Sequence, residues 1–318
     1  MKRLLVFFFF FVSISLLSCT QADIEDIIIP DIDTAVPFFD SISIIQLNYD
    51  SSMMPHPSSV LYWMDNNSLG SGSKQGGDCY QNFFCQFKVN HEALDIYDLK
   101  SKSAITSVPM SSLGEAFHCN NADFGSSFFE EGDAFPLVYS SQQGQGARCL
   151  IVDRVCCVNG VNIIETIQKI NLPFEEVVPL QYTPDAIIDK ENGYIYVYAG
   201  NTIPITDLYI YKFRLPSISE GKIVQLKKDD ILAAWAIYGD PAYYKQGATI
   251  HGDFIYILEG VPGWNADAIL RVIDLNYNCY KCINLSKSFN IRWEPEDVFF
   301  YNDSLFIASN GSGIYLLK

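Results

Sequence analysis

Seven polar residues stand at the starts of strand-like segments, and their side chains are of types that bind ligands. They are Gln75, His118, Asn120, Asp185, Gln246, Glu294 and Glu296. If these segments surround a common axis, the seven side chains meet at one mouth of a central channel, where they could bind a ligand. The same groups could instead satisfy the backbone at the strand ends and hold trapped water, so a structural role stays open.

The carboxylates of this region permit two further kinds of chemistry. Glu294, Glu296, Asp297 and Asp185 could hold a structural Ca²⁺ or Mg²⁺, because hard cations prefer clustered carboxylates, although their spacing is not that of an EF-hand loop. The same carboxylates with His118 could act as a general acid/base pair on a glycoside or an ester. Carboxylates meet easily by chance in a chain this acidic. The sequence therefore favours binding without catalysis and predicts no cofactor.

Eight cysteines follow Cys19, and none of them completes a recognisable metal or redox site. Cys279 and Cys282 form a C-x-x-C pair, but no second pair or nearby histidine completes a zinc site. Cysteines in the apolar strand segments are expected to pack as small hydrophobic side chains. Free thiols are the expectation, with disulfides as the alternative. The chain also has no P-loop, no G-x-G-x-x-G motif and no G-x-S-x-G elbow.

An internal repeat indicates the elements that position these residues. Residues 74–99 and 245–275 both open on Lys-Gln-Gly, turn at Asn82 or Asp253, and close on Asp-Leu. The later copy is longer, and the extra residues fall in a hairpin loop, where insertions are tolerated. A repeated unit of several aromatic-rich strands predicts a radial β architecture, a propeller.

The repeat sets the expected number of blades. Units starting near Gln75, His118, Asp185, Gln246 and Glu294 are about 55 residues long on average, above the roughly 40–50 of a minimal blade. We therefore predict an all-β, five-bladed propeller, with six blades as the alternative if Ile44–Met64 helps to form another. Lys222–Leu226 is expected to be the edge of the third unit. The N-terminal strand Ser43–Asn48 should pair with Gly313–Leu317 in the last blade and so close the ring.

Composition agrees with a single large β domain and excludes one class of partner. The 318 residues include 22 Phe and 19 Tyr, which favour strands. Lys and Arg number 21 against 37 Asp and Glu, a net charge of -16. Nucleic acid is excluded as a partner, because phosphate contacts need Lys and Arg.

The N-terminus predicts export and a lipid anchor. Lys2 and Arg3 precede the apolar run Leu4–Leu17, which is typical of a signal peptide and short for a membrane span. The run leads into Leu16-Leu17-Ser18-Cys19, which is similar to a bacterial lipobox. We expect a signal peptide over residues 1–18, lipidation of Cys19, an acidic tether over 19–39, and the propeller over 40–318.

The motifs together resemble a known group of proteins. The Lys-Gln-Gly units, the His118-Cys119-Asn120 start and the Trp293-Glu294-Pro295-Glu296-Asp297 start resemble exported propeller lipoproteins of Gram-negative gut bacteria, of the TolB-like propeller kind. The likeness covers about residues 40–318 and the lipobox. It implies a scaffold or binding protein, and it assigns no catalytic residue.

The resulting functional expectation has a leading form and an alternative. We expect a monomeric propeller of the cell envelope, held to the membrane through Cys19 on the periplasmic or surface face of the outer membrane. It should bind an unidentified ligand or protein at the channel mouth. The alternative is a glycan-directed hydrolase or lyase that uses the carboxylates and His118 at the same mouth.

Overall fold

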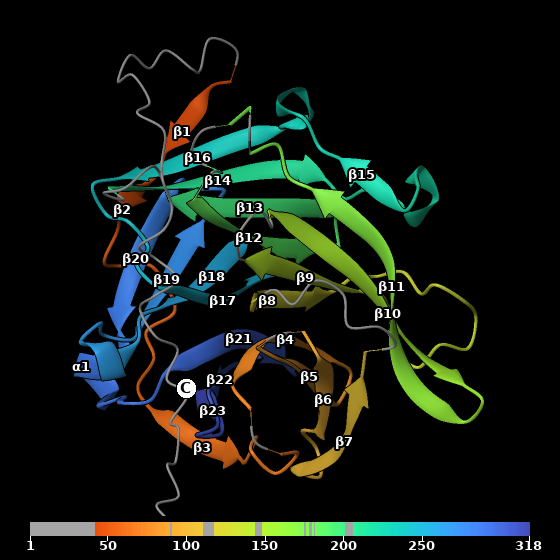
Figure 1. The fold of residues 1–318 in the computed structure, drawn as a ribbon. Coiled ribbons are helices and arrows are strands. Elements are labelled where there is room, and N and C mark those ends of the chain that lie inside the picture. The colour runs from red at the N-terminus through yellow and green to blue at the C-terminus, as the bar shows by residue number, and fades with distance from the viewer. Residues whose placement is uncertain are drawn as a thin grey trace, which may run out of the picture. The chain divides into compact units, whose positions relative to one another are not determined.

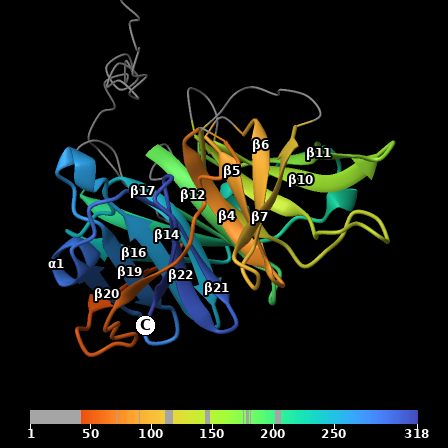
Figure 2. The same ribbon diagram turned by 90° about the horizontal axis from the view of Figure 1, so that it is seen from below.

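The structure is a computed structural model, and it describes residues 42–70, 72–89, 91–110, 118–143, 148–174, 176–177, 180, 182–200 and 206–318. The described strands form five sheets that follow one another around a central axis (Figures 1 and 2). Each sheet is one blade. The prediction of a five-bladed propeller is therefore confirmed, and the six-bladed alternative is not needed.

The blades are numbered in chain order, and the strands of each blade are given from the axis outward. Blade 1 contains β4 (Lys74–Tyr80), β5 (Phe83–Lys88), β6 (Ala93–Asp98) and β7 (Ser103–Pro109). Blade 2 contains β8 (His118–Phe124), β9 (Val138–Gln143), β10 (Cys149–Val158), β11 (Val161–Asn171) and β15 (Ile223–Gln225). Blade 3 contains β12 (Tyr182–Asp189), β13 (Tyr194–Gly200), β14 (Asp207–Arg214), β16 (Ala233–Tyr238) and β1 (Ile44–Gln46).

Blades 4 and 5 complete the ring. Blade 4 contains β17 (Lys245–His251), β18 (Phe254–Glu259), β19 (Ile269–Asp274), β20 (Cys279–Asn284) and β2 (Asn48–Tyr49). Blade 5 contains β21 (Pro295–Tyr301), β22 (Ser304–Ser309), β23 (Ile314–Leu317) and β3 (Val60–Met64). The described helices are short: α1 (Leu285–Phe289), η3 (Ile218–Glu220), η4 (Lys228–Asp230) and η5 (Pro262–Trp264).

An N-terminal strand closes the ring, but it is not the strand that the sequence predicted. Val60–Met64 pairs antiparallel with Ile314–Leu317 of the last blade. Within the predicted segment Ser43–Asn48, Ile44–Gln46 pairs in parallel with β16 of blade 3, and Asn48 with β20 of blade 4. The N-terminal segment thus covers the outer edges of three successive blades. Leu47, which is buried, anchors it between blades 3 and 4.

The predicted edge of the third blade is also corrected. Ile223–Gln225, inside the predicted edge Lys222–Leu226, pairs in parallel with β11 of blade 2. The fourth strand of blade 3 is β16, which pairs with β14. Leu226 is buried in the hydrophobic layer between blades 2 and 3, where Val224 also packs. The chain therefore crosses to the neighbouring blade and returns, because this exchange buries two apolar side chains.

The hydrophobic core is divided into five layers, each lying between two adjacent blades. The layer between blades 2 and 3, for example, packs Leu150 and Val152 against Val197 and Phe213. The other four layers repeat this arrangement around the ring. All eight cysteines within the described ranges are free thiols, and Cys85 and Cys119 are buried in one of these layers. Burial between the blades leaves the axis itself to other interactions.

The five inner strands meet at the axis through a β-bulge at the same place in each blade. The pairing of every inner strand with the second strand shifts there, for instance between Lys74 and Gly77 and between Lys245 and Ala248. The glycine of each Lys-Gln-Gly sequence lies in its bulge. A Cβ on Gly76 would lie 2.5 Å from backbone atoms of Asn121, and one on Gly247 would lie 2.5 Å from the Cα of Asp297. The repeated glycines thus permit neighbouring inner strands to touch.

This close approach predicts a large cost for one methyl group. Gly247→Ala should lower the free energy of unfolding by about 1–3 kcal/mol or more, because the added Cβ meets backbone that cannot move aside. Gly263→Ala is the matched control, since its Cβ would meet no atom within 4 Å. Urea unfolding of both variants measures the difference. Equal stability of the two variants would contradict the packed axis.

Candidate functional site

The structure brings the seven predicted site residues to one end of the axis. We call this end, where the inner strands begin, the first mouth. Gln75, Asn120, Gln246 and Glu296 all lie in the bulges of their inner strands. Asp185 directly follows the bulge of β12, and His118 and Glu294 stand at or just before the start of their strands. The blades are therefore where the sequence predicted them, but the residues are not at equivalent positions, since His118 and Glu294 precede the bulge and Asp185 follows it.

Most of these side chains are buried, and several join one blade to the next. Asn120 Nδ2 donates to Asp185 Oδ2 at 3.0 Å and to the carbonyl oxygen of Lys245 at 3.0 Å, which connects blades 2, 3 and 4. Gln246 Nε2 donates to Glu294 Oε1 at 3.4 Å. Asn310 Nδ2 in turn donates to Glu294 Oε2 at 3.1 Å. The set thus stabilises contacts between inner strands, and ligand binding by it stays a prediction.

Two members of the set make fewer contacts within the described ranges. Gln75 is 4 % exposed, and its Oε1 accepts no hydrogen bond from any described residue. Burial lowers the pKa of His118 from its ordinary value of 6.5. His118 forms no ion pair with a carboxylate of the described chain. The proposed acid/base partnership of His118 with a carboxylate therefore has no direct contact behind it here.

Two residues at the first mouth escaped the sequence analysis. Asn121 Nδ2 donates to the carbonyl oxygen of Ala186 at 2.7 Å, and its Oδ1 accepts from the Ala248 amide at 2.8 Å. It occupies the bulge position that glycine holds in blades 1 and 4, so aligning the repeats would have found it. The buried Lys245 Nζ lies 3.9 Å from Asp185 Oδ2. Burial lowers the pKa of Lys245, while Asp185 and Glu259 raise it.

The opposite end of the axis, where the inner strands finish, holds a cavity. We call this end the second mouth. The cavity has a volume of about 60 Å³, and residues of blades 1, 3, 4 and 5 line it. They are Asp78, Ile188, Asp189, Lys190, Glu191, Thr249, Ile250, His251, Gly252 and Phe300. None of them belongs to the predicted site. They lie at the ends of inner strands and in the turns that follow, and the sequences of these turns are those of ordinary hairpins, which give no sign of a binding site.

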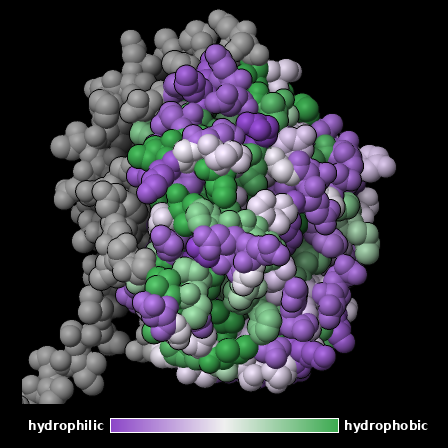
Figure 3. Space-filling view, turned by 90° about the vertical axis from the view of Figure 1, so that its right-hand side faces the viewer, coloured by the Kyte–Doolittle hydropathy of each residue, from purple (hydrophilic) through white to green (hydrophobic). Residues whose placement is uncertain are grey.

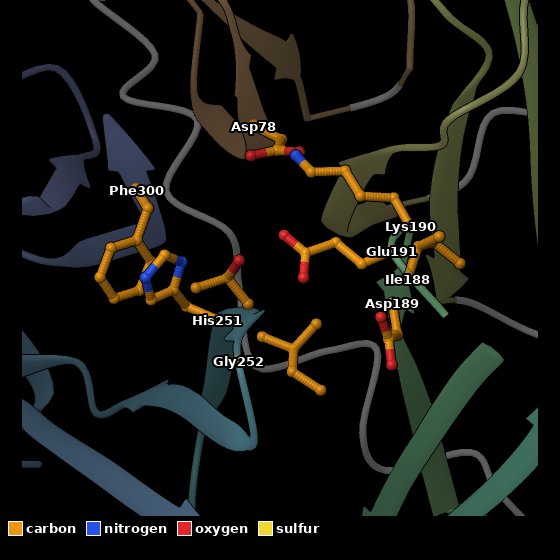
Figure 4. A pocket seen from close by; sticks show the side chains of 10 residues that line it. Asp78, Ile188, Asp189, Lys190, Glu191, His251, Gly252 and Phe300 are labelled. Carbon is orange, nitrogen blue, oxygen red and sulfur yellow. The ribbon is translucent and has the colours of Figure 1, made fainter. Parts of the chain in front are cut away.

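The side chains of the second mouth carry opposite charges and an aromatic wall (Figure 4). Lys190 Nζ lies 3.5 Å from Asp78 Oδ2, and this carboxylate raises the pKa of Lys190. The rings of His251 and Phe300 stack with their centroids 4.1 Å apart. Glu191 is exposed and directs its carboxylate toward the cavity. The second mouth is therefore polar, accessible and formed wholly by described residues.

Two further carboxyl groups, those of Asp123 and Asp297, lie buried on the inner strands of blades 2 and 5, and Asp297 directly follows the bulge of β21 at the first mouth. Burial raises the pKa of Asp123 and of Asp297 well above 3.8, and repulsion from Asp78 adds to both shifts. Asp123 Oδ2 accepts from the Ile188 amide at 3.0 Å. The described residues contain no group of three or more His, Cys, Asp or Glu side chains placed to hold a metal ion. The inner strands thus carry buried carboxyl groups whose charged forms are disfavoured by burial.

Other surfaces of the described chain give weaker indications of a binding site. A hollow of about 330 Å³ lies against blade 4, but Lys281 on its wall donates to the carbonyl oxygen of Met53 at 3.0 Å and contacts His56 Nδ1 at 2.8 Å. The lysine there fastens the N-terminal segment. The face shown in Figure 3 carries hydrophilic and hydrophobic residues side by side. No helix among the described residues is long and apolar enough to span a membrane.

The raised pKa of Asp297 predicts how stability depends on pH. Above the ordinary value of 3.8 the unfolded chain loses the proton that the folded chain retains, so the free energy of unfolding falls as pH rises. Asp297→Asn removes this effect. Its stability relative to the parent should rise by up to about 1.4 kcal/mol per pH unit above pH 4. Denaturant unfolding from pH 3.5 upward tests this, and a difference independent of pH would contradict it.

Comparisons with known proteins give fold-level likenesses only. No protein-family model matches the chain, and no curated protein matches its sequence. Among solved structures, glutaminyl cyclase of Myxococcus xanthus is 12% identical over 86% of this chain and 97% of that chain, with a TM-score of 0.46. The tail fibre of Staphylococcus aureus phage P68 is 16% identical over 81% of this chain and 52% of its own, with a TM-score of 0.48. The PQQ-bound aldose sugar dehydrogenase of Streptomyces coelicolor is 11% identical over 82% and 98%, with a TM-score of 0.44. None of them carries an argument about function, and the propeller fold stands on the strand pairing.

Proposed function

We propose that this protein is a lipid-anchored propeller of the cell envelope, of the TolB-like lipoprotein kind, that binds a small ligand without catalysis. The observation that carries the binding role is the cavity at the second mouth. Its walls come from four blades, so the closed ring fixes their mutual positions before any ligand arrives. A site held in place in this way binds without a large ordering cost.

The second mouth supports this role better than the first mouth does. Asn120, Asp185, Gln246 and Glu296 are each at least nine-tenths buried, and Asn120 and Gln246 hold neighbouring blades together. A ligand could reach them only by breaking those contacts. Glu191 and His251, by contrast, are exposed at the cavity. Ligand binding by the first-mouth set remains a second, separate prediction.

Anchoring is supported by the sequence alone. Cys19 follows an apolar run in a lipobox-like context, and this segment lies outside the described residues. Acyl chains on Cys19 would hold the propeller at a membrane surface. The acidic stretch from residue 20 to 39 would then act as the tether.

The anchor predicts a change of cell fraction. Cys19→Ala removes the thiol that would carry the lipid, so the variant should move from the membrane fraction to the soluble fraction of the cell envelope. Ser18→Ala is the control, because it changes a neighbouring residue and leaves the thiol in place. Immunoblots of the separated fractions measure the outcome. If the Cys19→Ala protein sediments with membranes as the parent does, the anchor is not there.

The cavity predicts a ligand that co-purifies with the protein. Ile250 lines the cavity and is partly exposed, so Ile250→Trp should fill the space without emptying the core. Ile105→Trp, on the exposed strand β7, is the matched control. Denaturing the purified proteins and analysing released small molecules by mass spectrometry should find a compound with the parent and with Ile105→Trp only. Equal recovery from Ile250→Trp would place the ligand elsewhere.

A further inference from the structure

We infer that the second mouth binds a primary ammonium group at the end of an alkyl chain. This inference rests on the proposed function, since it names the class of ligand for the same cavity. The ammonium group could belong to a free small amine or to a lysine side chain of another protein. Both sources present the same chemistry to the cavity.

The charges around the cavity favour a cation. Three carboxylates line it, from Asp78, Asp189 and Glu191, against the single ammonium group of Lys190. Lys190 pairs with Asp78, and the Asp189 carboxylate accepts from the backbone and side-chain amides of Asn192. Glu191 forms no ion pair with any residue that the structure describes. One carboxylate thus faces the cavity without a counter-charge, and the protein's net charge of -16 attracts cations toward it.

Lys190 shows that the cavity accepts such a group. Its side chain is itself an aminoalkyl chain, and its ammonium end lies beside Asp78 at the cavity wall (Figure 4). Because the neighbouring carboxylate stabilises the charged form, Lys190 stays protonated and is a cation rather than a nucleophile. Lys190 pairs with Asp78 and not with Glu191, so a second ammonium group can bind the Glu191 carboxylate.

The cavity also offers an unused hydrogen-bonding group. Thr249 lines the cavity and is 7 % exposed, yet its hydroxyl makes no hydrogen bond to another described residue. A hydroxyl that no protein group satisfies takes its partner from a ligand or from water. An ammonium group has three donors. It can therefore satisfy the Thr249 oxygen and the Glu191 carboxylate together.

Size and wall chemistry narrow the ligand to a slender chain. A volume of about 60 Å³ holds roughly four water molecules by the same measure. That space fits an ammonium group with a few methylene groups but excludes a sugar ring or a nucleotide. Ile188, Ile250 and the stacked pair of His251 and Phe300 provide apolar wall for the methylene groups. An anionic ligand of the same length would meet three carboxylates and be repelled.

The probe for this inference is 1,5-diaminopentane, compared with 1,5-pentanediol and glutarate, which have similar length and different charge. The chain contains four histidines, and His251 lies in the cavity wall, so its ring resonances in NMR report directly on occupancy. Only the diamine should shift the His251 signals in a saturable way. Glu191→Gln should weaken this binding about tenfold, the equivalent of one charged contact. Glu165→Gln, an exposed carboxylate on β11 of blade 2, should leave it unchanged.

The outcomes separate the ligand class from the site. If the diol or glutarate shifts His251 as strongly as the diamine, the site stands and the ammonium class is wrong. If the diamine binds Glu191→Gln as tightly as the parent, the inference is also overturned. If none of the three shifts His251, the accessible cavity of the proposed function fails with it. Nα-acetyl-lysine methylamide keeps the side-chain ammonium group of a lysine within a protein. If it binds more strongly than the diamine, a protein lysine is the source, and the reverse result would identify a free amine.

Discussion

The closed ring forces five inner strands to meet around one axis, and the rest of the structure follows from that contact. Among the described residues, apolar side chains are buried in layers between the blades and form no separate hydrophobic cluster on the axis. Backbone therefore meets backbone at Gly76 and Gly247, where no side chain fits. Asn121 fills the corresponding place in blade 2 and satisfies backbone groups of blades 3 and 4. Where the inner strands converge, hydrogen bonds to backbone groups take the place of apolar packing.

This constraint gives the two ends of the axis different chemistry. At the first mouth, the bulges turn Asn120, Asn121 and Gln246 onto neighbouring strands, and their side chains form hydrogen bonds between blades. Asp123 and Asp297 are buried on the inner strands, and burial raises the pKa of both carboxyl groups. Among the described residues that line the cavity, Lys190 supplies the ammonium group. The axis thus passes from an interlocked end to an accessible one.

The sequence predicted the blades well because the repeated residues include the glycines that the contacts between inner strands require. Lys-Gln-Gly recurs since each glycine sits at a bulge, and β4 and β17 each begin at the lysine of its copy. The sequence correctly predicted that an N-terminal strand closes the ring, but it predicted the wrong strand. Ile44–Gln46 and Asn48–Tyr49 are too short to carry a periodic pattern, and parallel pairing at an outer edge leaves no turn to mark it. Val60–Met64 has the composition of a strand, but its sequence does not indicate that it pairs with Ile314–Leu317.

The cavity lay beyond sequence reasoning because it depends on the lengths of turns in different blades. In blades 1, 3, 4 and 5 a tight turn joins the inner strand to the second strand, as between Tyr80 and Phe83 or between His251 and Phe254. Turns this short cannot reach across the axis. Blade 2 has a long connection instead, from Phe124 to Val138, and none of its described residues lines the cavity. The opening therefore forms where four short hairpins leave the axis uncovered, and the charges of residues 189–191 and of Asp78 decide what can enter it.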